Sequence, residues 1–266
     1  MPEPNTRAGI QTTATSFEII HVLQENGPCR LSTIASELDM PESTAHRHLD
    51  TLHSLRYVSR CGQKYQIGLR FARLGEVART RDPAFRQAKD YVREVAEETG
   101  ERAQFVVEDH GLGVYLYLET GQKAVRAGLE VGRQIRLHCS SAGKAILSGY
   151  TRSRVDEILD QWGLPEQTEH TITDREAYHE ELERVRERGV AFNQEEHIYG
   201  LNAVGVPVTG ADGAVLGALC VSAPSHRMKG ELFRETVPDL LLGSANALEL
   251  KLAYSNQEQT DSVVVE

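Results

Sequence analysis

The sequence predicts an α+β protein with two domains: a small N-terminal domain of helices and one hairpin, and a larger C-terminal domain of strands and helices. Three observations support this fold. Apolar residues recur at helical spacing up to Leu55, strand-like runs joined by turns follow Gly100, and an amphipathic stretch separates the two regions. We therefore place the domains at 10–70 and 101–254, linker helices with the start of the C-terminal domain at 71–100, and a disordered polar tail at 255–266.

Three short helices are predicted in the N-terminal domain. The first covers Ser16–Glu25 and ends at Gly27-Pro28, and the second begins with Ser32 as its N-cap. A turn at 39–41 leads into the third helix, Pro41–Leu55, because proline discourages a helical residue before it. Apolar residues mark one side of this third helix, and its other positions carry Glu42, Ser43, Thr44, His46, Arg47, His48 and Asp50.

The polar side of the third helix is typical of a helix that contacts DNA. Short hydroxyls and an arginine near a helix N-terminus suit phosphates and base edges in a major groove. The strands YVSR and YQIG follow, and the turn between them places two basic residues where they can touch backbone phosphate. The order predicts a winged helix-turn-helix domain that binds double-stranded DNA through Ser43, Thr44, His46, Arg47, His48, Arg60 and Lys64. A winged helix that binds another protein is the alternative.

Charge is divided unevenly along the chain. The formal net charge is −10, yet residues 1–72 hold seven basic and seven acidic residues, so the excess of acid lies in 73–266. The acidic load therefore avoids the predicted DNA-binding domain. Only six of the 29 basic residues are lysines, which fits a salt-adapted cytosol, although a genome rich in G and C also favours arginine.

Several protein classes are excluded by composition. No apolar run approaches the roughly 20 residues that span a bilayer. The N-terminal MPEPNTRAG lacks an apolar segment, so we expect a cytoplasmic protein. Scattered cysteines without a CxxC pair indicate reduced thiols rather than disulfides or a metal site; they are Cys29, Cys61, Cys139 and Cys220.

Two linker helices are predicted, the first ending near Thr80 and the second starting at Asp82-Pro83, with aspartate as N-cap. An apolar stripe on the first helix is a candidate contact with a second copy of the chain, which would make a homodimer or homotetramer. The second helix could equally pack onto its own C-terminal domain. The stripe consists of Phe71, Leu74, Val77 and Ala78.

The C-terminal domain alternates hairpins with helices. Turns at Gly111 and at 210–213 join neighbouring strands, which favours an antiparallel sheet covered by helices. The predicted strands are 103–108, 113–119, 125–130, 191–195, 203–209 and 215–222, and the predicted helices are 141–149, 153–162, 174–188 and 230–252.

Motifs of enzymes are weak in this chain. Ser141 and Lys144 match the S-x-x-K pattern of serine hydrolases, but the SDN and KTG motifs that accompany it are missing. The Glu195-Glu196-His197 triplet could ligate a metal only in part, because adjacent strand residues point to opposite faces. We expect no catalysis, no cofactor and no metal, with Lys144 as a charge at a helix surface or pocket rim. A serine hydrolase is the least favoured alternative.

The stretch from Ser16 to Leu252 resembles the IclR family of transcriptional regulators. The resemblance is carried by MPESTAHRHLDTL with the following hairpin, by LHCSSAGKAIL at 137–147, and by GVAFNQEEHIYGLNAVGVPV and GAVLGALCVSAP further on. It implies a GAF-like C-terminal domain that binds a small organic effector, dimers or tetramers, and a palindromic promoter site. Composition and resemblance together suggest a haloarchaeal regulator of carbon-source catabolism, with activation or repression left open.

The resemblance also implies where the effector binds. Backbone N–H groups of 140–143 at a helix start make a cradle for an anion or hydroxyl. The family usually has cysteine at Ala203, arginine or a similar residue at Asn202, and often an acid at Asn193. Fewer charges favour a neutral polyol or sugar-derived ligand over a dicarboxylate. The expected pocket residues are Ser141, Ala142, Asn193, Leu201, Asn202, Ala203, Cys220 and Ser222; the serines could instead be a helix cap and a strand hydroxyl.

Overall fold

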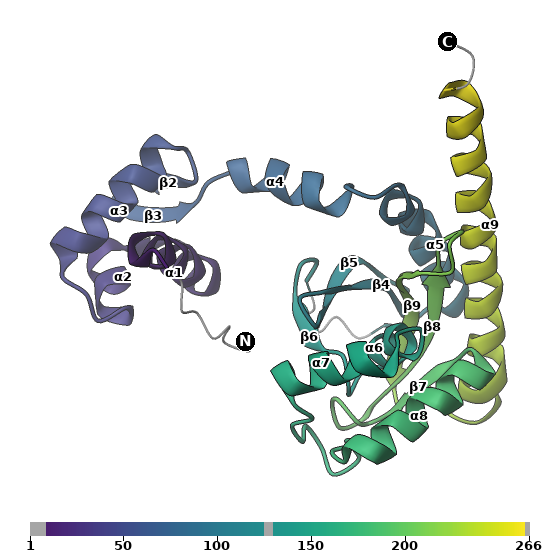
Figure 1. The fold of residues 1–266 in the computed structure, drawn as a ribbon. Coiled ribbons are helices and arrows are strands. Elements are labelled where there is room, and N and C mark those ends of the chain that lie inside the picture. The colour runs from purple at the N-terminus through teal and green to yellow at the C-terminus, as the bar shows by residue number, and fades with distance from the viewer. Residues whose placement is uncertain (1–8, 125–129, 264–266) are drawn as a thin grey trace. The chain divides into compact units, whose positions relative to one another are not determined.

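The computed structural model describes residues 9–124 and 130–263, with side chains as far as Tyr254 (Figure 1). The chain divides into two compact units, the first ending at Arg81 and the second beginning at Asp82. This boundary lies inside the segment predicted as a linker, so the two predicted linker helices belong to different units.

Unit 1 is a winged helix-turn-helix domain, as predicted. Its small antiparallel sheet has the order β1-β3-β2, and apolar residues of three helices, among them Ile19, Ile34 and Leu49, form its core with the sheet. The elements are α1 (Gln11–Asn26), β1 (Cys29–Arg30), α2 (Leu31–Glu37), α3 (Glu42–Ser54), β2 (Val58–Cys61), β3 (Lys64–Ile67) and α4 (Arg70–Arg79).

The starts of the first two helices differ from the sequence prediction. Helix α1 begins at Gln11, earlier than predicted, and ends as predicted at Gly27, whose φ of +68° suits glycine. Helix α2 begins at Leu31 with Arg30 as N-cap, so Ser32 does not cap it. The reason is β1, which pairs with β3 and fixes the backbone before the helix.

Helix α5 (Pro83–Thr99) belongs to unit 2 and follows the predicted signals closely. The Asp82 side chain accepts the Ala84 N–H at 2.8 Å, and Gly100 in the left-handed conformation ends the helix. Its apolar side, including Val92 and Val95, packs into the core of unit 2. This helix therefore packs onto its own C-terminal domain, which is one of the two partners that the sequence left open.

The centre of unit 2 is a six-stranded antiparallel sheet in the order β6-β5-β4-β9-β8-β7. Two helices, α5 and α9 (Val237–Val263), pack on one face. Helices α6 (Ser141–Ser148), α7 (Arg152–Trp162) and α8 (Arg175–Arg188) pack on the other. The strands are β4 (Arg102–Asp109), β5 (Leu112–Thr120), β6 (Gln134–Arg136), β7 (Ala191–Gln194), β8 (Leu201–Thr209) and β9 (Val215–Pro224).

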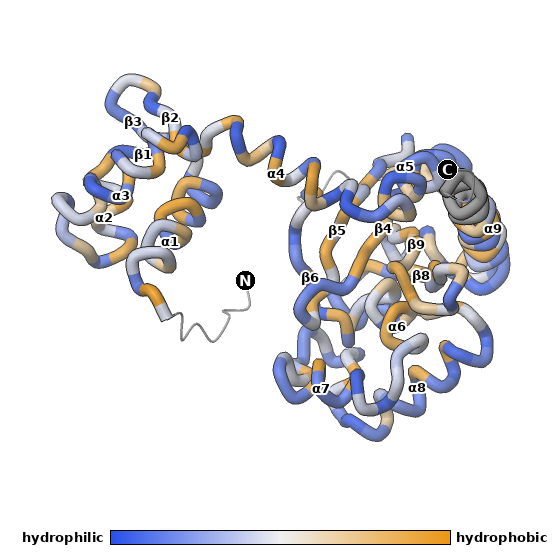
Figure 2. Tube along the Cα trace, turned by 45° about the horizontal axis from the view of Figure 1, so that its top comes forward, coloured by the Kyte–Doolittle hydropathy of each residue, from blue (hydrophilic) through white to orange (hydrophobic). Residues whose placement is uncertain are grey.

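The helices of unit 2 agree with prediction within a few residues up to the last one. They are α6 (Ser141–Ser148), α7 (Arg152–Trp162), α8 (Arg175–Arg188) and, after a π-helical turn at Leu232–Thr236, α9 (Val237–Val263). Figure 2 shows apolar segments along the central strands and hydrophilic segments along α8. These layers build the antiparallel sheet with covering helices that the sequence predicts.

Two differences concern unit 2. The predicted strand 125–130 lies outside the described residues except for Glu130, and the strand that follows, β6 at Gln134–Arg136, was not predicted. Helix α9 continues to Val263, past its predicted end at Leu252 and into the segment predicted as a disordered tail.

Candidate functional site

The outward side of α3 is the candidate DNA-binding surface. Its inner side, Ala45, Leu49 and Leu52, is buried in the core of unit 1. Ser43, His46 and Arg47 are exposed, and their spacing places them together on the opposite side. His46 lies 2.9 Å from Asp50 through Nδ1, a pair one helical turn apart. The outward side therefore presents a hydroxyl, a guanidinium and an imidazole without contributing to the core.

Two of the predicted DNA-binding residues point elsewhere. His48 is half-buried, and its Nδ1 lies 2.8 Å from the Ser16 Oγ of α1. Thr44, one turn earlier, is half-buried on the same flank. His48 thus links α3 to α1. Its position beside Arg47 in the sequence suggests a DNA contact instead.

The wing carries its basic residues in two different ways. Lys64 is exposed at the start of β3, next to the two-residue turn that includes Gly62. Arg60 donates to the Tyr65 hydroxyl at 2.8 Å, and its guanidinium lies 4.9 Å from the centre of the Tyr65 ring. Lys64 is therefore free to reach phosphate, whereas Arg60 is held against its own sheet.

A groove of about 690 Å³ runs beside α3 within unit 1. Apolar side chains of α1, α3 and α4 line most of it, and Arg47 and His48 stand at its wall. Several of these side chains are exposed although they are large and apolar: Phe17, Leu55 and Leu74.

A second group of polar residues lies in unit 2 on the sheet face covered by α6. Strand register places Arg102 and Gln104 of β4 opposite Ser222 and Cys220 of β9, respectively. Ala203 of β8 lies opposite Ser222, and Asn193 of β7 lies opposite Ala203. Directly paired residues share a face of the sheet, so strands distant in sequence bring these side chains together. We call the set Arg102, Gln104, Asn193, Ala203, Cys220 and Ser222 the α6-face cluster.

The N-terminus of α6 rests on this face. A Cβ atom on Gly205 of β8 would lie 2.8 Å from the carbonyl carbon of Ser141, so glycine is needed for the close approach. Ser141 and Ala142 are both buried beside it. The structure therefore brings Ser141 and Ala142 to the same region as the cluster.

Hydrogen bonds connect the middle of the cluster. Gln104 Nε2 donates to Ser222 Oγ at 2.8 Å, and the Cys220 thiol donates to Gln104 Oε1 at 3.1 Å. Arg102 is buried as well, and desolvation lowers its pKa while the Tyr115 phenol opposes that shift. An arginine remains charged even so. Sequence analysis missed Arg102 and Gln104, because nothing local distinguishes them from other strand residues.

The predicted cradle at the start of α6 is smaller than expected. Ser140 caps the helix by accepting the Gly143 N–H at 3.0 Å, and its own N–H bonds to the Leu137 carbonyl. Among the described residues, Ser141 and Ala142 keep backbone N–H groups without a hydrogen-bond partner. Two donors at a helix N-terminus remain for a ligand.

Asn193 holds the backbone of this region. Its Nδ2 donates to the Cys139 carbonyl at 2.7 Å, and its Oδ1 accepts the Glu196 N–H at 3.1 Å. A carboxylate could not make the first of these bonds, since it has no proton to donate. An asparagine at position 193, where the family often has an acid, therefore links the loop before α6 to the turn after β7.

Asn202 does not join the cluster. It alternates with Ala203 along β8, pairs with Ala223 and donates through Nδ2 to the Met228 carbonyl at 2.9 Å, on the α9 side of the sheet. The expectation that Asn202 shares a pocket with Ser141 and Ser222 is therefore incorrect in geometry. Leu201 keeps the orientation of Ala203 but lies partly exposed at the strand start.

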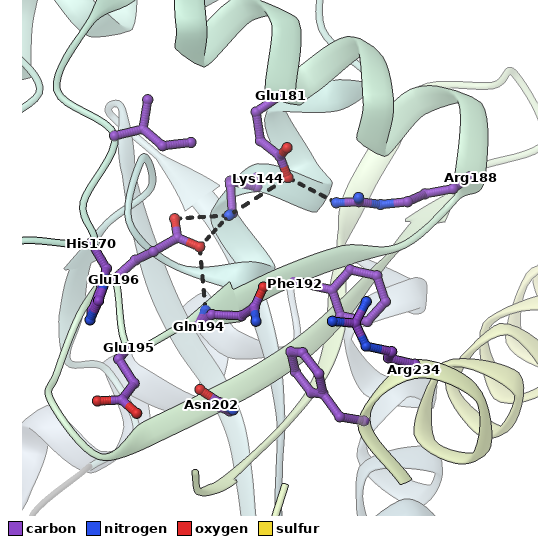
Figure 3. Close-up of a pocket in the computed structure, with 12 residues that line it drawn as sticks. Lys144, His170, Glu181, Arg188, Phe192, Gln194, Glu195, Glu196, Asn202 and Arg234 are labelled. Carbon is purple, nitrogen blue, oxygen red and sulfur yellow. Dashed lines mark hydrogen bonds and ion pairs between the residues drawn. The ribbon is translucent and has the colours of Figure 1, made fainter. Parts of the chain in front are cut away.

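Lys144 is buried, which corrects its assignment to a surface or rim. Only 1% of it is exposed, and Nζ lies 2.7 and 2.8 Å from the two carboxylate oxygens of Glu196 (Figure 3). Glu181 lies 3.8 Å away on the other side. Burial raises the pKa of Glu196 and the Lys144 ammonium opposes that shift. Because the ammonium is bound to carboxylate, Lys144 is not positioned to activate Ser141.

The edge strand β7 is bordered by side chains. Arg188 Nε donates to the Val190 carbonyl just before β7, and Glu196 accepts the Gln194 N–H at 3.4 Å. The same arginine lies over the Phe192 ring, 4.8 Å from its centre.

The described residues contain neither a membrane-spanning helix nor a cluster of metal-binding side chains. None of their helices is long and apolar enough to cross a membrane. Nor do three His, Cys, Asp or Glu side chains gather there in a way that could hold a metal ion.

Comparisons with known proteins agree with this architecture. Residues 14–61 match the IclR helix-turn-helix domain, and residues 79–249 match the bacterial transcriptional regulator IclR C-terminal domain. A probable HTH-type transcriptional regulator, ArcR of Halobacterium salinarum, is 29% identical over 247 residues, which cover 91% of this chain and 94% of that protein.

Two solved structures are similar. The IclR protein of Thermotoga maritima has 27% identity and a TM-score of 0.78, covering 91% of this chain and 98% of that one. The PobR inducer-binding domain from Acinetobacter, a double mutant in complex with 3-hydroxybenzoic acid, has 29% identity and a TM-score of 0.56, covering 61% and 95%.

These matches define a DNA-binding transcriptional regulator with an effector-binding C-terminal domain, rather than an enzyme. The chain belongs to the IclR family.

Proposed function

We propose that the chain controls genes for the breakdown of a carbon source and that it acts in the cytoplasm in response to a sugar acid bound at the α6-face cluster. The observation that carries the effector class is the buried guanidinium of Arg102 beside Gln104 and Ser222. A guanidinium binds carboxylate, while the amide, the hydroxyl and the two free N–H groups of α6 suit a ligand with oxygen atoms.

This proposal revises the ligand expected from sequence. The neutral side chains of Asn193 and Asn202, where the family often has charged ones, favour a neutral polyol. Arg102 adds a buried positive charge to the site, which favours an acid. The related PobR domain holds a hydroxylated carboxylic acid, which supports an acid over a neutral sugar. The combination of one cation with several neutral hydrogen-bonding groups favours a hydroxylated monocarboxylate.

On the DNA side, we propose that Ser43, His46 and Arg47 contact the major groove and that Lys64 contacts backbone phosphate. Exposure and the absence of any core role support these four residues. Thr44, His48 and Arg60 are proposed to act indirectly, by holding α3 and the wing in position, as the contacts of His48 and Arg60 with Ser16 and Tyr65 support.

We also propose that the chain binds a palindromic promoter site as a dimer or larger assembly. A single winged helix covers a short half-site, so specificity requires two of them. The exposed apolar residues Leu74, Val77 and Ala78 of the predicted stripe support α4 as the contact. Phe71 is partly buried and packs against Tyr57, with ring centres 5.0 Å apart, so less of its surface is open to a second copy. Light scattering should show at least a dimer, and operator binding by a monomer would contradict this.

A thermal-shift screen with sugars, sugar acids and aromatic acids tests the effector class. A ligand at a hundredfold excess over its Kd should stabilise the protein by roughly 2.7 kcal/mol. A gel shift on the chain's own upstream promoter DNA should then change with the same acid, since coupling between sites is reciprocal. The substitution Ser141→Leu should abolish the response and spare DNA binding. A full response in Ser141→Leu would place the effector elsewhere.

A further inference from the structure

A pocket of about 620 Å³ lies beyond the edge strand β7, outside the α6-face cluster (Figure 3). Side chains from α6, α8, β7, β8, the π-helical turn before α9, the loop at 170–172 and the turn after β7 form its walls. Figure 3 shows Lys144 and Glu181 on one side, Asn202 on the opposite side, and Phe192 and Arg234 together at one end.

The strongest indication of a ligand is the Asn202 amide. The residue is 8% exposed, and its Oδ1 is buried without a hydrogen-bond partner among the described residues. Its Nδ2 is already bound to the Met228 carbonyl, which fixes the orientation of the amide. A buried acceptor without a donor destabilises a protein. The cross-strand neighbour Gln194 is exposed on the same face and can move aside.

Among the lysine and arginine side chains that the described part of the chain places in the pocket wall, one is available to a ligand. Lys144 is paired with Glu196, and Arg188 is paired with Glu181 at 2.8 Å. Arg234 is exposed and forms no ion pair among the described residues. A negatively charged ligand group would therefore meet Arg234, at the end opposite Glu196.

Glu195, the remaining carboxylate in the wall, is engaged elsewhere. It accepts the Gly200 N–H at 2.8 Å, a bond that holds the pKa of its carboxyl below the usual range. His170, the remaining titratable side chain in the wall, lies 3.9 Å from the Glu169 carboxylate. Glu195 is therefore held by the turn that contains Gly200, and His170 lies beside an acidic neighbour on its own loop.

We propose that this pocket is a second ligand site, which binds a small carboxylic acid that also carries a hydroxyl or N–H donor. Arg234 binds the carboxylate by charge-assisted hydrogen bonds, and the donor group satisfies Asn202 Oδ1. The rings of Phe192 and Phe233, 5.0 Å apart between centres, supply the apolar contact. Asn202 and Ala203 point to opposite faces of the sheet, so this site is separate from the one proposed for the effector and goes beyond it.

Calorimetric titration of the full-length chain tests the site with three probes. D-gluconate carries both groups, acetate carries the carboxylate alone, and D-glucose carries hydroxyls alone. Gluconate should bind about tenfold more tightly than either of the others, the factor expected from one added charge-assisted bond. Arg234→Ala should weaken this binding event about tenfold. Arg86→Ala, which removes an exposed arginine of α5 outside the pocket, should leave it unchanged.

Two further variants separate this site from the α6-face cluster. Asn202→Ala should weaken gluconate binding, as Arg234→Ala does. If Asn202→Ala does not fold, the result with Arg234→Ala decides the test. Ser222→Ala should leave the event intact. Loss in Ser222→Ala with survival in Arg234→Ala would place the acid at the α6-face cluster, which overturns the second site and leaves the proposed function standing. The second site is also overturned if gluconate does not bind, or if Arg86→Ala and Arg234→Ala weaken it equally.

Discussion

The outward side of α3 and the α6-face cluster use similar polar side chains under opposite conditions. On α3, Ser43 and Arg47 are exposed, and a single helix sets their spacing. In the cluster, Gln104 and Ser222 are buried and bonded to each other across 118 positions of sequence. Residues on the outward side of α3 can therefore be replaced at little cost in stability. Residues of the α6-face cluster cannot, because their hydrogen bonds help to hold the C-terminal domain together.

In this molecule, the residues expected to recognise DNA are therefore different from the polar residues that stabilise the fold. An exposed side chain that contacts no core group affects mainly what it binds. A buried polar group affects stability as soon as its partner is removed, because the remaining group is left without a hydrogen bond. The two regions therefore predict different outcomes for single substitutions.

The largest effect is expected at the buried pair of Lys144 and Glu196. Lys144→Met leaves the Glu196 carboxylate buried without its cation and should lower the free energy of unfolding by about 3–5 kcal/mol. Urea denaturation followed by circular dichroism measures this. The double variant Lys144→Met, Glu196→Leu should recover much of the loss. Arg152→Met breaks an exposed pair with Glu176 and should leave stability almost unchanged. Equal losses in the two single variants would remove the contrast between buried and exposed polar groups.

A second effect depends on pH and involves His138. Burial lowers the pKa of this histidine from 6.5 to about 4, and its Nε2 bonds to the Pro165 carbonyl at 3.0 Å. The unfolded chain therefore binds a proton more readily than the folded one between these values. Stability should fall by roughly 3 kcal/mol as pH drops from about 6.5 to about 4. His197, whose pKa burial also lowers, acts in the same direction.

Urea midpoints across this pH range measure the effect. In His138→Gln, which keeps a donor for the Pro165 carbonyl, the curve should be flatter than in the wild type. His226→Gln, an exposed histidine, should keep the wild-type slope. A wild-type slope in His138→Gln would show that other groups cause the loss.

The third prediction concerns specificity on the exposed side. Arg47→Ala should weaken binding to the operator by about 1–3 kcal/mol and leave the fold intact, since Arg47 is outside the core. Fluorescence anisotropy with the chain's own upstream promoter DNA measures the affinity. The exposed Arg86 of unit 2 gives the matched control, and Arg86→Ala should bind normally. Operator binding at wild-type strength in Arg47→Ala would exclude this residue from the interface.

The smallest effect is expected at the wing. Lys64→Ala should weaken specific and unspecific DNA binding alike and reduce the slope of log affinity against log salt by about 1. Repeating the anisotropy titration at several salt concentrations measures that slope. Lys64 is a cleaner probe than Arg60, whose removal also leaves the Tyr65 hydroxyl without its partner. An unchanged slope would mean that Lys64 does not contact phosphate.

The same contrast explains what could be predicted from the sequence. Helix α5 was predicted almost to the residue because its limits are local signals, Asp82-Pro83 at the start and Gly100 at the end. The winged helix was predicted for the same reason, since its helices and hairpin are consecutive. Strand β1 was missed because two residues become a strand only through pairing with β3.

The site in unit 2 could be predicted only in part. Family resemblance predicts that Ser141, Ala142, Ala203, Cys220 and Ser222 lie together. Strand register places the last three on one face of the sheet, and the close approach of Gly205 brings the start of α6 to that face. The role of Arg102 and the pairing of Lys144 with Glu196 could not be predicted from local sequence. The residues that surround them come from segments up to 120 positions apart. The period of two along β8, applied strictly, would have separated Asn202 from Ala203.

The short edge strand β7 has a consequence for how the protein behaves at high concentration. Open sheet edges invite pairing with another chain and lead to aggregation. Here Arg188 occupies the Val190 carbonyl and Glu196 occupies the Gln194 N–H, so charged side chains stand at both ends of a four-residue strand. This edge of the sheet is thereby protected from pairing with a strand of a neighbouring molecule.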